Sequence, residues 1–189
     1  MALEIADLES THNFTFAKHL VFETESFKLQ VLEKSNPEIE SKETPIALGK
    51  KFDQELKEGL VPPCEIKHIS EDVGFGLYAL SPVYKGSFLG EYTGLICHGS
   101  SYYKMNNYLF KYPVKNEAGN DLSIDAEPYG NHTRFINHSF KPNLDHHYAY
   151  HRGLYHLIFV ANRDIKEGEQ FTFNYGHGYW YLRGAPDTF

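Results

Sequence analysis

Four short segments in the C-terminal two thirds of the chain contain residue types that bind ligands or take part in chemistry. They are residues 74–76 (GFG), 90–94 (GEYTG), 131–139 (NHTRFINHS) and 168–176 (GEQFTFNYG). None of them has the pattern of a nucleophile elbow, a metalloprotease helix or a phosphate-binding loop. No third glycine of a dinucleotide-binding fingerprint follows GFG, which argues against that function.

The histidines and cysteines do not form a metal-binding pattern. Six of the eleven histidines lie between residues 132 and 156, and imidazole is a common metal ligand. No acidic or cysteine partner has a suitable spacing, and a strand would direct His146 and His147 to opposite faces. Cys64 and Cys97 are the only cysteines and form no CxxC motif, so a zinc cluster and a disulfide framework are excluded. We expect no metal.

The composition is that of a packed globular protein with an acidic surface. Of 189 residues, 41% are hydrophobic and 15% aromatic, which is typical of a domain with a core. The formal net charge of −7 argues against general nucleic-acid binding. No long apolar stretch is present, and early acidic residues leave no signal-peptide core, so we expect no membrane contact. A cytoplasmic or nuclear location follows; delivery into another cell is an alternative that the sequence leaves open.

The N-terminal third differs from the rest of the chain. Residues 1–60 hold 12 acidic and 7 basic side chains and few glycines. Phe52, Leu56 and Leu60 recur at helical spacing in KKFDQELKEGL, and the Val-Pro-Pro sequence that follows ends any helix. We therefore predict a partly helical N-terminal extension over residues 1–63. Neither its role nor the oligomeric state can be read from these residues.

From residue 64 onward, short apolar runs alternate with glycine, proline and asparagine. Runs such as SFLGEYTGLI, LYHLIFVA and QFTFNY follow one another at short spacing. This pattern predicts a mainly β fold built of several small sheets, with few short helices.

In chain order, the motifs of this region resemble those of the SET-domain protein lysine methyltransferases. The series is GFG, EYTG, YLF, IDA, GNHTRFINHS followed by PN, and RDIKEGEQFTFNYG. RFINHS and GEQFTFNYG, about thirty residues apart, form a highly specific pair. The resemblance implies a SET catalytic domain over residues 64–181, in which the RFINHS and FNY segments cross as a pseudoknot, and a C-terminal tail over residues 182–189.

The resemblance also implies the cofactor, which is S-adenosylmethionine, with S-adenosylhomocysteine as product and no metal. Many relatives have a cysteine after NHS and a cysteine-rich tail that binds zinc. Here Phe140 stands after NHS and the tail has no cysteine, which is typical of compact members without flanking zinc modules. The residues implied to bind the cofactor are Phe75, Gly76, Leu77, Tyr108, Arg134, Phe135, Asn137, His138 and Trp180.

The implied catalytic residues are Tyr175, the near-invariant active-site tyrosine, and Tyr92, a second tyrosine of the lysine channel. Phe173, Tyr179 and His146 are the implied walls of that channel. Methyl transfer to an amine needs a neutral nucleophile, whereas a free lysine has a pKa of about 10.4. An aromatic channel that holds little water lowers that pKa. Phenylalanine at position 173, rather than tyrosine, favours di- or trimethylation, although His146 is able to narrow the site.

The resemblance leaves the substrate open. A lysine-bearing protein or peptide is implied, and a histone or another basic protein fits equally well. A SET fold that binds partners without turnover is the rival hypothesis, and the retention of Tyr175, Asn137, His138 and GFG argues against it. Methylation of a small amine is a third alternative.

Overall fold

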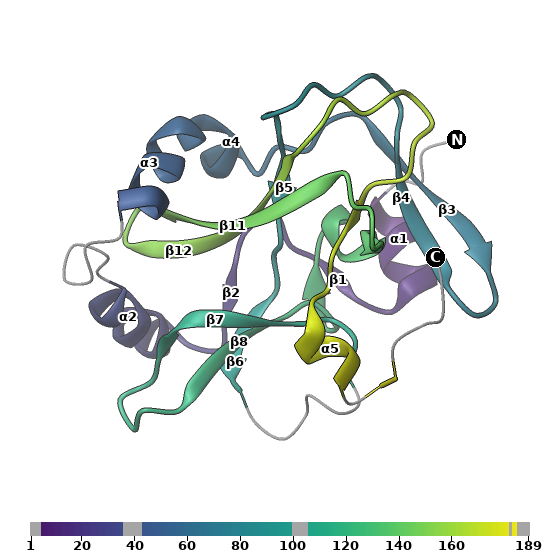
Figure 1. The fold of residues 1–189 in the computed structure, drawn as a ribbon. Coiled ribbons are helices and arrows are strands. Elements are labelled where there is room, and N and C mark those ends of the chain that lie inside the picture. Colours follow the sequence, from purple (N-terminus) through teal and green to yellow (C-terminus); the bar gives the residue numbers. More distant parts are fainter. Residues whose placement is uncertain (1–4, 36–42, 100–105, 182, 185–189) are drawn as a thin grey trace.

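The computed structural model describes residues 5–35, 43–99, 106–181 and 183–184. Within these ranges the chain forms several small sheets with short helices around them (Figure 1). The predicted mainly β class and the helical N-terminal segment are therefore confirmed. Most of the predicted tail, residues 182–189, lies outside the described residues.

The largest sheet has four strands in the order β2-β6-β8-β7, and a second has three in the order β11-β12-β5. The first comprises β2 (Val21–Phe22), β6 (Leu95–His98), β8 (Asp121–Asp125) and β7 (Leu109–Lys115). The second comprises β11 (Leu144–His151), β12 (Leu154–Ala161) and β5 (Phe88–Glu91). Three two-stranded sheets complete the set: β3 (Cys64–Ser70) with β4 (Gly74–Ala79), β1 (Thr15–Phe16) with β9 (Tyr129–Gly130), and β10 (Asn137–His138) with β13 (Thr172–Phe173).

The core lies between these sheets and is filled by the apolar runs. Leu157, Phe159 and Phe171 are each 0% exposed. Burying one such side chain contributes about 1.5–3 kcal/mol. β12 is buried along most of its length because helices cover the face that points away from this core. These helices are α3 (Glu43–Lys51) and α4 (Asp53–Glu58), which lie over β11 and β12 (Figure 1).

The N-terminal extension packs closely on the rest of the chain. At Gly49 of α3, an added Cβ would lie 1.8 Å from the carbonyl oxygen of Tyr150, so only glycine permits this approach. Phe52 and Leu56 are buried as the helical pattern predicts, but Leu60 is 41% exposed. The helix ends before Leu60 because Gly59 adopts a left-handed conformation with φ of 61°.

The remaining helices of the extension lie at two sides of the sheets. They are α1 (Ile5–His12) and α2 (Glu25–Lys34). The segment between these two helices adds two strands, β1 and β2, that the sequence did not indicate. β1 pairs in parallel with β9, and β2 pairs in parallel with β6. Among the described residues, no helix has the length and apolar character needed to cross a membrane.

A chain of polar groups, buried except for Asp53 at its outer end, connects α4 to β5. His156 donates from Nδ1 to Oε1 of Glu91 at 2.7 Å and from Nε2 to the carbonyl oxygen of His151 at 3.2 Å. Because both ring nitrogens of His156 face acceptors, both carry protons and the ring is a cation. His151 in turn donates to Oδ1 of Asp53 at 2.9 Å. The Glu91 side chain is 1% exposed, so this is a buried ion pair.

Candidate active site

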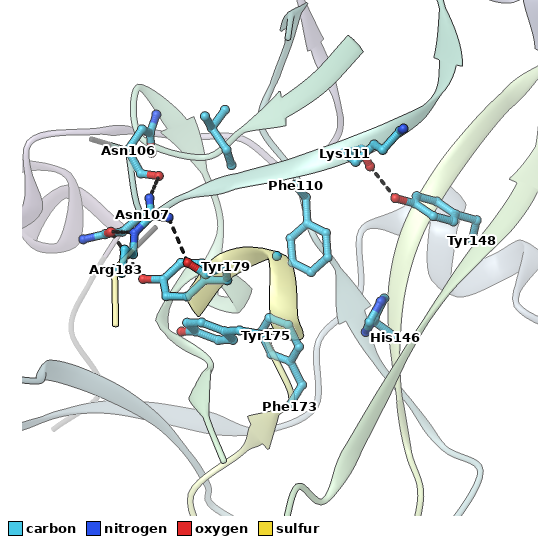
Figure 2. Close-up of a pocket in the computed structure, with 12 residues that line it drawn as sticks. Asn106, Asn107, Phe110, Lys111, His146, Tyr148, Phe173, Tyr175, Tyr179 and Arg183 are labelled. Atoms are coloured by element: carbon cyan, nitrogen blue, oxygen red, sulfur yellow. Dashed lines mark hydrogen bonds between the residues drawn. The ribbon is translucent and has the colours of Figure 1, made fainter. Parts of the chain in front are cut away.

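Two adjoining hollows meet at the C-terminal end of the chain. The larger hollow, about 480 Å³, is lined by Phe75, Tyr108, Arg134, Asn137, His138 and Trp180, among others. The second, which we call the aromatic pocket, is about 400 Å³ and is shown in Figure 2. It is lined by Phe110, His146, Phe173, Tyr175 and Tyr179 together with polar residues at its rim. Tyr175, Tyr179 and Asn107 line both, so they form the boundary between the two hollows.

The predicted segments are brought together by the parallel pairing of β10 with β13. Asn137 lies opposite Thr172, and His138 lies opposite Phe173. Asn143 supports this pair, since its Nδ2 donates to the carbonyl oxygen of Gln170 at 2.8 Å and its Oδ1 accepts from the Thr172 amide at 2.9 Å. The Pro-Asn after NHS therefore fixes the register of β13, which ends two residues before Tyr175.

Asn137 joins this strand pair to the GFG segment, which begins β4. Its Nδ2 donates to the carbonyl oxygen of Phe75 at 2.8 Å. At Gly76, an added Cβ would lie 2.5 Å from Nε2 of Gln170 and 2.7 Å from Cδ1 of Ile69. A side chain at position 76 would therefore require the ends of the Gln170 and Ile69 side chains to move.

Asn137→Ala is expected to weaken cofactor binding before it affects the fold. The substitution removes a partly buried hydrogen bond that positions the backbone of the GFG segment. The loss of this bond costs about 1 kcal/mol of binding free energy, or roughly fivefold in affinity, and more if the segment relaxes. Isothermal titration with S-adenosylhomocysteine measures this effect. Asn174→Ala is the matched control, since that exposed asparagine directly follows β13 and lines neither hollow. Equal affinity of Asn137→Ala and wild type would contradict the assigned role.

Arg134 is held between aromatic rings on one wall of the larger hollow. Its guanidinium carbon lies 4.3 Å from the ring centroid of Phe14 and 4.2 Å from that of Tyr108. Its Nε donates to the carbonyl oxygen of Ala126 at 2.8 Å. Burial lowers the pKa of this guanidinium, but an arginine remains charged at any physiological pH. The wall therefore presents a fixed positive charge.

Unpartnered polar atoms gather around the larger hollow. Within the described part of the chain, four of its lining residues have a buried nitrogen without a hydrogen-bond partner: His12, His138, Gln170 and Trp180. For His138 the proton position is fixed, because Nδ1 accepts from the Tyr175 amide at 3.1 Å and the proton must therefore lie on Nε2. Such donors require acceptors. S-adenosylmethionine supplies them through its carboxylate, ribose and adenine, so the residues present fit this cofactor.

Tyr175 stands at the boundary of the two hollows. Its hydroxyl donates to the carbonyl oxygen of Ile136 at 3.0 Å. Its ring centroid lies 4.7 Å from that of Phe173 and 4.7 Å from that of Tyr179. Burial raises the pKa of Tyr175 above the usual value, so the phenol stays protonated at neutral pH. It can donate and accept hydrogen bonds but is not a strong base.

The floor of the aromatic pocket is built from three phenylalanines. Phe110 stacks on Phe173 with ring centroids 5.5 Å apart, and Phe159 packs behind Phe173 at 4.9 Å. His146 lies at the exposed rim, 5.5 Å from the Phe110 centroid (Figure 2). Desolvation beside these rings lowers the pKa of His146, so this ring is neutral at pH 7. The pocket is apolar inside and carries polar groups only near its mouth.

A polar cluster after α5 (His177–Tyr181) stabilises the part of the pocket rim that contains Tyr179. Arg183 donates to Oδ1 of Asn107 at 3.0 Å and to the carbonyl oxygen of Asn106 at 2.8 Å. Its guanidinium carbon lies 4.3 Å from the ring centroid of Tyr179 (Figure 2). These contacts hold Tyr179 against Tyr175.

Most of the predicted site residues line one of the two hollows, but some do not. Seven predicted cofactor residues line the larger hollow: Phe75, Tyr108, Arg134, Phe135, Asn137, His138 and Trp180. The predicted channel residues Phe173, Tyr179 and His146 line the aromatic pocket together with Tyr175. Gly76 and Leu77 line neither, and the Leu77 side chain lies in the core at 1% exposure. Tyr92 is buried behind the pocket, and its hydroxyl donates to the carbonyl oxygen of Tyr108 at 2.8 Å.

The structure also brings residues to the site that the motifs did not single out. Phe110 and Asn107 flank the predicted Tyr108 in NNYLF, so their closeness in sequence was the available signal. Gln170 precedes the FTFNY strand, and His12 comes from a region without any motif. Among the described residues, no three histidine, cysteine or acidic side chains gather as a metal site would require.

Comparison with known proteins gives one consistent result. A model of the SET domain family matches residues 74–176. Histone-lysine N-methyltransferase EHMT1 of Homo sapiens is 33% identical over 119 residues, which are 61% of this chain and 9% of that protein. Histone-lysine N-methyltransferase Su(var)3-9 of Drosophila melanogaster is 32% identical over 132 residues, which are 64% of this chain and 21% of that protein. The chain thus spans a small part of the length of these relatives.

The fold is also similar to that of a solved structure. The crystal structure of ATXR5 in complex with histone H3.1 mono-methylated on R26 superposes with a TM-score of 0.68. The likeness covers 90% of this chain and 85% of that chain at 17% sequence identity, so it concerns the fold alone.

Proposed function

Since the chain belongs to the SET domain family, we propose that it is a protein-lysine N-methyltransferase that uses S-adenosylmethionine. The observation that carries this proposal is the meeting of the two hollows at Tyr175. One hollow has unpartnered donors and a fixed positive charge, as a cofactor site requires. The other is a pocket lined by aromatic rings, which suits the aliphatic part of a lysine side chain.

When bound, the cofactor supplies a methyl group on a positively charged sulfur. The residues of the chain place a lysine amine opposite that group. Phe110, Phe173 and Tyr179 surround the aliphatic part of the lysine and keep water away. Low polarity disfavours the ammonium form, so the amine loses its proton at a lower pH than in water. Aromatic faces also attract cationic methylated products.

Alignment is the main contribution that we assign to this site. When two reactants are held in line in adjoining hollows, the activation free energy falls by up to about 7–11 kcal/mol relative to the reaction of free molecules. The Tyr175 hydroxyl, positioned by Ile136, orients the amine and the methyl group at the boundary. Tyr92 positions Tyr108 from outside the pocket. Its hydroxyl donates a hydrogen bond to the backbone of Tyr108, which lies between β7 and the larger hollow.

For the substrate, we propose a lysine in a histone or another basic protein. The support comes from the relatives, which are named as histone-lysine methyltransferases. The net charge of −7 also favours encounter with a basic partner. The test is transfer of labelled methyl groups to purified histones, other basic proteins and cell lysate, with mass spectrometry of the product. Cofactor binding without transfer to any of these would favour a binding module over an enzyme.

We also propose that the site proceeds beyond monomethylation, because position 173 is phenylalanine. Phe173 is 4% exposed and its ring edge faces the pocket between His146 and Tyr175. Phe173→Tyr is expected to shift the products toward monomethyl-lysine, since the added hydroxyl and a bound water take the space of a second methyl group. Mass spectrometry of a methylated peptide at equal turnover measures the shift. Tyr148→Phe at the outer rim is the control, and unchanged product ratios in Phe173→Tyr would contradict the proposal.

A further inference from the structure

His12 reaches the larger hollow from the N-terminal extension. It is the last residue of α1 and lies outside the segment that matches the family. Its ring packs edge-on against Phe75, with centroids 4.4 Å apart, and against Phe135 at 4.8 Å. Both phenylalanines line the larger hollow, as His12 itself does. The extension therefore supplies part of the wall of the proposed cofactor site.

The position of His12 is fixed by its surroundings. Leu8, one turn earlier in α1, is 1% exposed in the core. The carboxylate of Glu9 accepts from the Phe16 amide at 2.6 Å, and Phe14 stacks on Arg134. The segment around His12 is thus held by packing, by a hydrogen bond and by a cation–π contact. The imidazole is already in place without a ligand.

The imidazole has a polar atom that needs a partner. Nε2 of His12 is screened from solvent and has no hydrogen-bond partner among the described residues. Burial and the positive charge of Arg134 lower the pKa of His12, so the ring is neutral near pH 7. A buried nitrogen without a partner is unfavourable unless a ligand supplies one.

We propose that His12 is a binding residue for the methyl donor and that its Nε2 forms a hydrogen bond with the bound cofactor. This inference rests on the proposed function, because it assigns the larger hollow to S-adenosylmethionine. It gives the N-terminal extension a direct part in cofactor recognition. His12 lies on the wall of the hollow beside Phe75 of β4.

The test compares three variants of the full chain in titrations with S-adenosylhomocysteine. His12→Ala is expected to weaken binding about 5- to 10-fold, which corresponds to one buried hydrogen bond. His12→Gln places an amide nitrogen near the position of Nε2 and is expected to restore most of the affinity. His19→Ala is the matched control, since this exposed histidine of the same extension lies outside the hollow. Thermal unfolding of each variant without ligand reports separately on the fold.

Each result decides between distinct conclusions. Wild-type affinity in His12→Ala would overturn this inference and leave the proposed function intact. Weak binding in both His12→Ala and His12→Gln, with lower unfolding temperatures, would assign His12 a structural role and overturn the inference too. No binding of S-adenosylhomocysteine to the wild-type chain would overturn the proposed function together with the inference.

Discussion

Tyr175→Phe is expected to lower the rate of methyl transfer by about 100- to 1,000-fold, the loss typical for one preorganised hydrogen-bonding group in an active site. The phenylalanine ring keeps the contacts with Phe173 and Tyr179 but lacks the hydroxyl that Ile136 positions. Affinity for S-adenosylhomocysteine should change little, because the ring still separates the two hollows. Single-turnover transfer to a substrate peptide and titration with the product measure the two quantities.

Tyr112→Phe is the matched control for this experiment. Its hydroxyl is also buried and accepts a hydrogen bond, from the Tyr155 amide at 3.1 Å, but it lines neither hollow. The variant should lose about 1 kcal/mol of stability and retain its turnover. Wild-type turnover in Tyr175→Phe would remove Tyr175 from the reaction, whereas equal losses in both variants would indicate a general effect of stability.

His156→Ala is expected to lower the free energy of unfolding by about 3–5 kcal/mol, because it leaves the buried carboxylate of Glu91 without its partner. Chemical denaturation followed by fluorescence measures the change. The double variant Glu91→Leu/His156→Leu removes both charges and should recover much of the loss. A double variant as unstable as the single one would show that packing, and not the unpaired charge, causes the effect.

The contribution of this pair should also depend on pH. Burial alone would lower the pKa of His156. The charge of Glu91 and its hydrogen bond raise the pKa by more than burial lowers it, so the pKa lies above the usual value. Protonated His156 stabilises the folded state. This stabilisation is complete at pH values below the pKa of the unfolded chain, about 6.5. It is lost as the pH rises through the pKa of the folded state. The difference between wild type and His156→Ala should therefore be larger near pH 6 than at about pH 9. Denaturation at the two pH values tests the sign.

The sequence predicted the elements that carry a strong local pattern. The run LYHLIFVA forms β12, and Leu56 lies in α4, which begins directly after Phe52. RFINHS and FTFNY are joined as their motifs imply, because Asn143 fixes the strand register. Such features are local, or they are constrained by contacts that the motif itself encodes.

Other features depend on packing that no local pattern encodes. β1 and β2 have two residues each, which is too short for an alternation to be read. Their partners, β9 and β6, lie far along the chain. The motifs located the segments of Leu77 and Tyr92, but not which face of the strand each side chain occupies. No sequence pattern pointed to His12, because its position at the hollow arises only when α1 packs beside Phe75 of β4.

The parallel pair β10-β13 has a consequence for how the protein becomes active during synthesis. β13 and Tyr175 come late in the sequence, whereas Phe75, whose carbonyl oxygen accepts a hydrogen bond from Asn137 of β10, is synthesised much earlier. Contacts of such long sequence separation form slowly, and a growing chain folds from its N-terminus. The sheets can collapse around the core while the last strand is missing, but the boundary between the two hollows cannot form. The protein should therefore be inert until residues 172–175 have been synthesised and β13 has paired with β10.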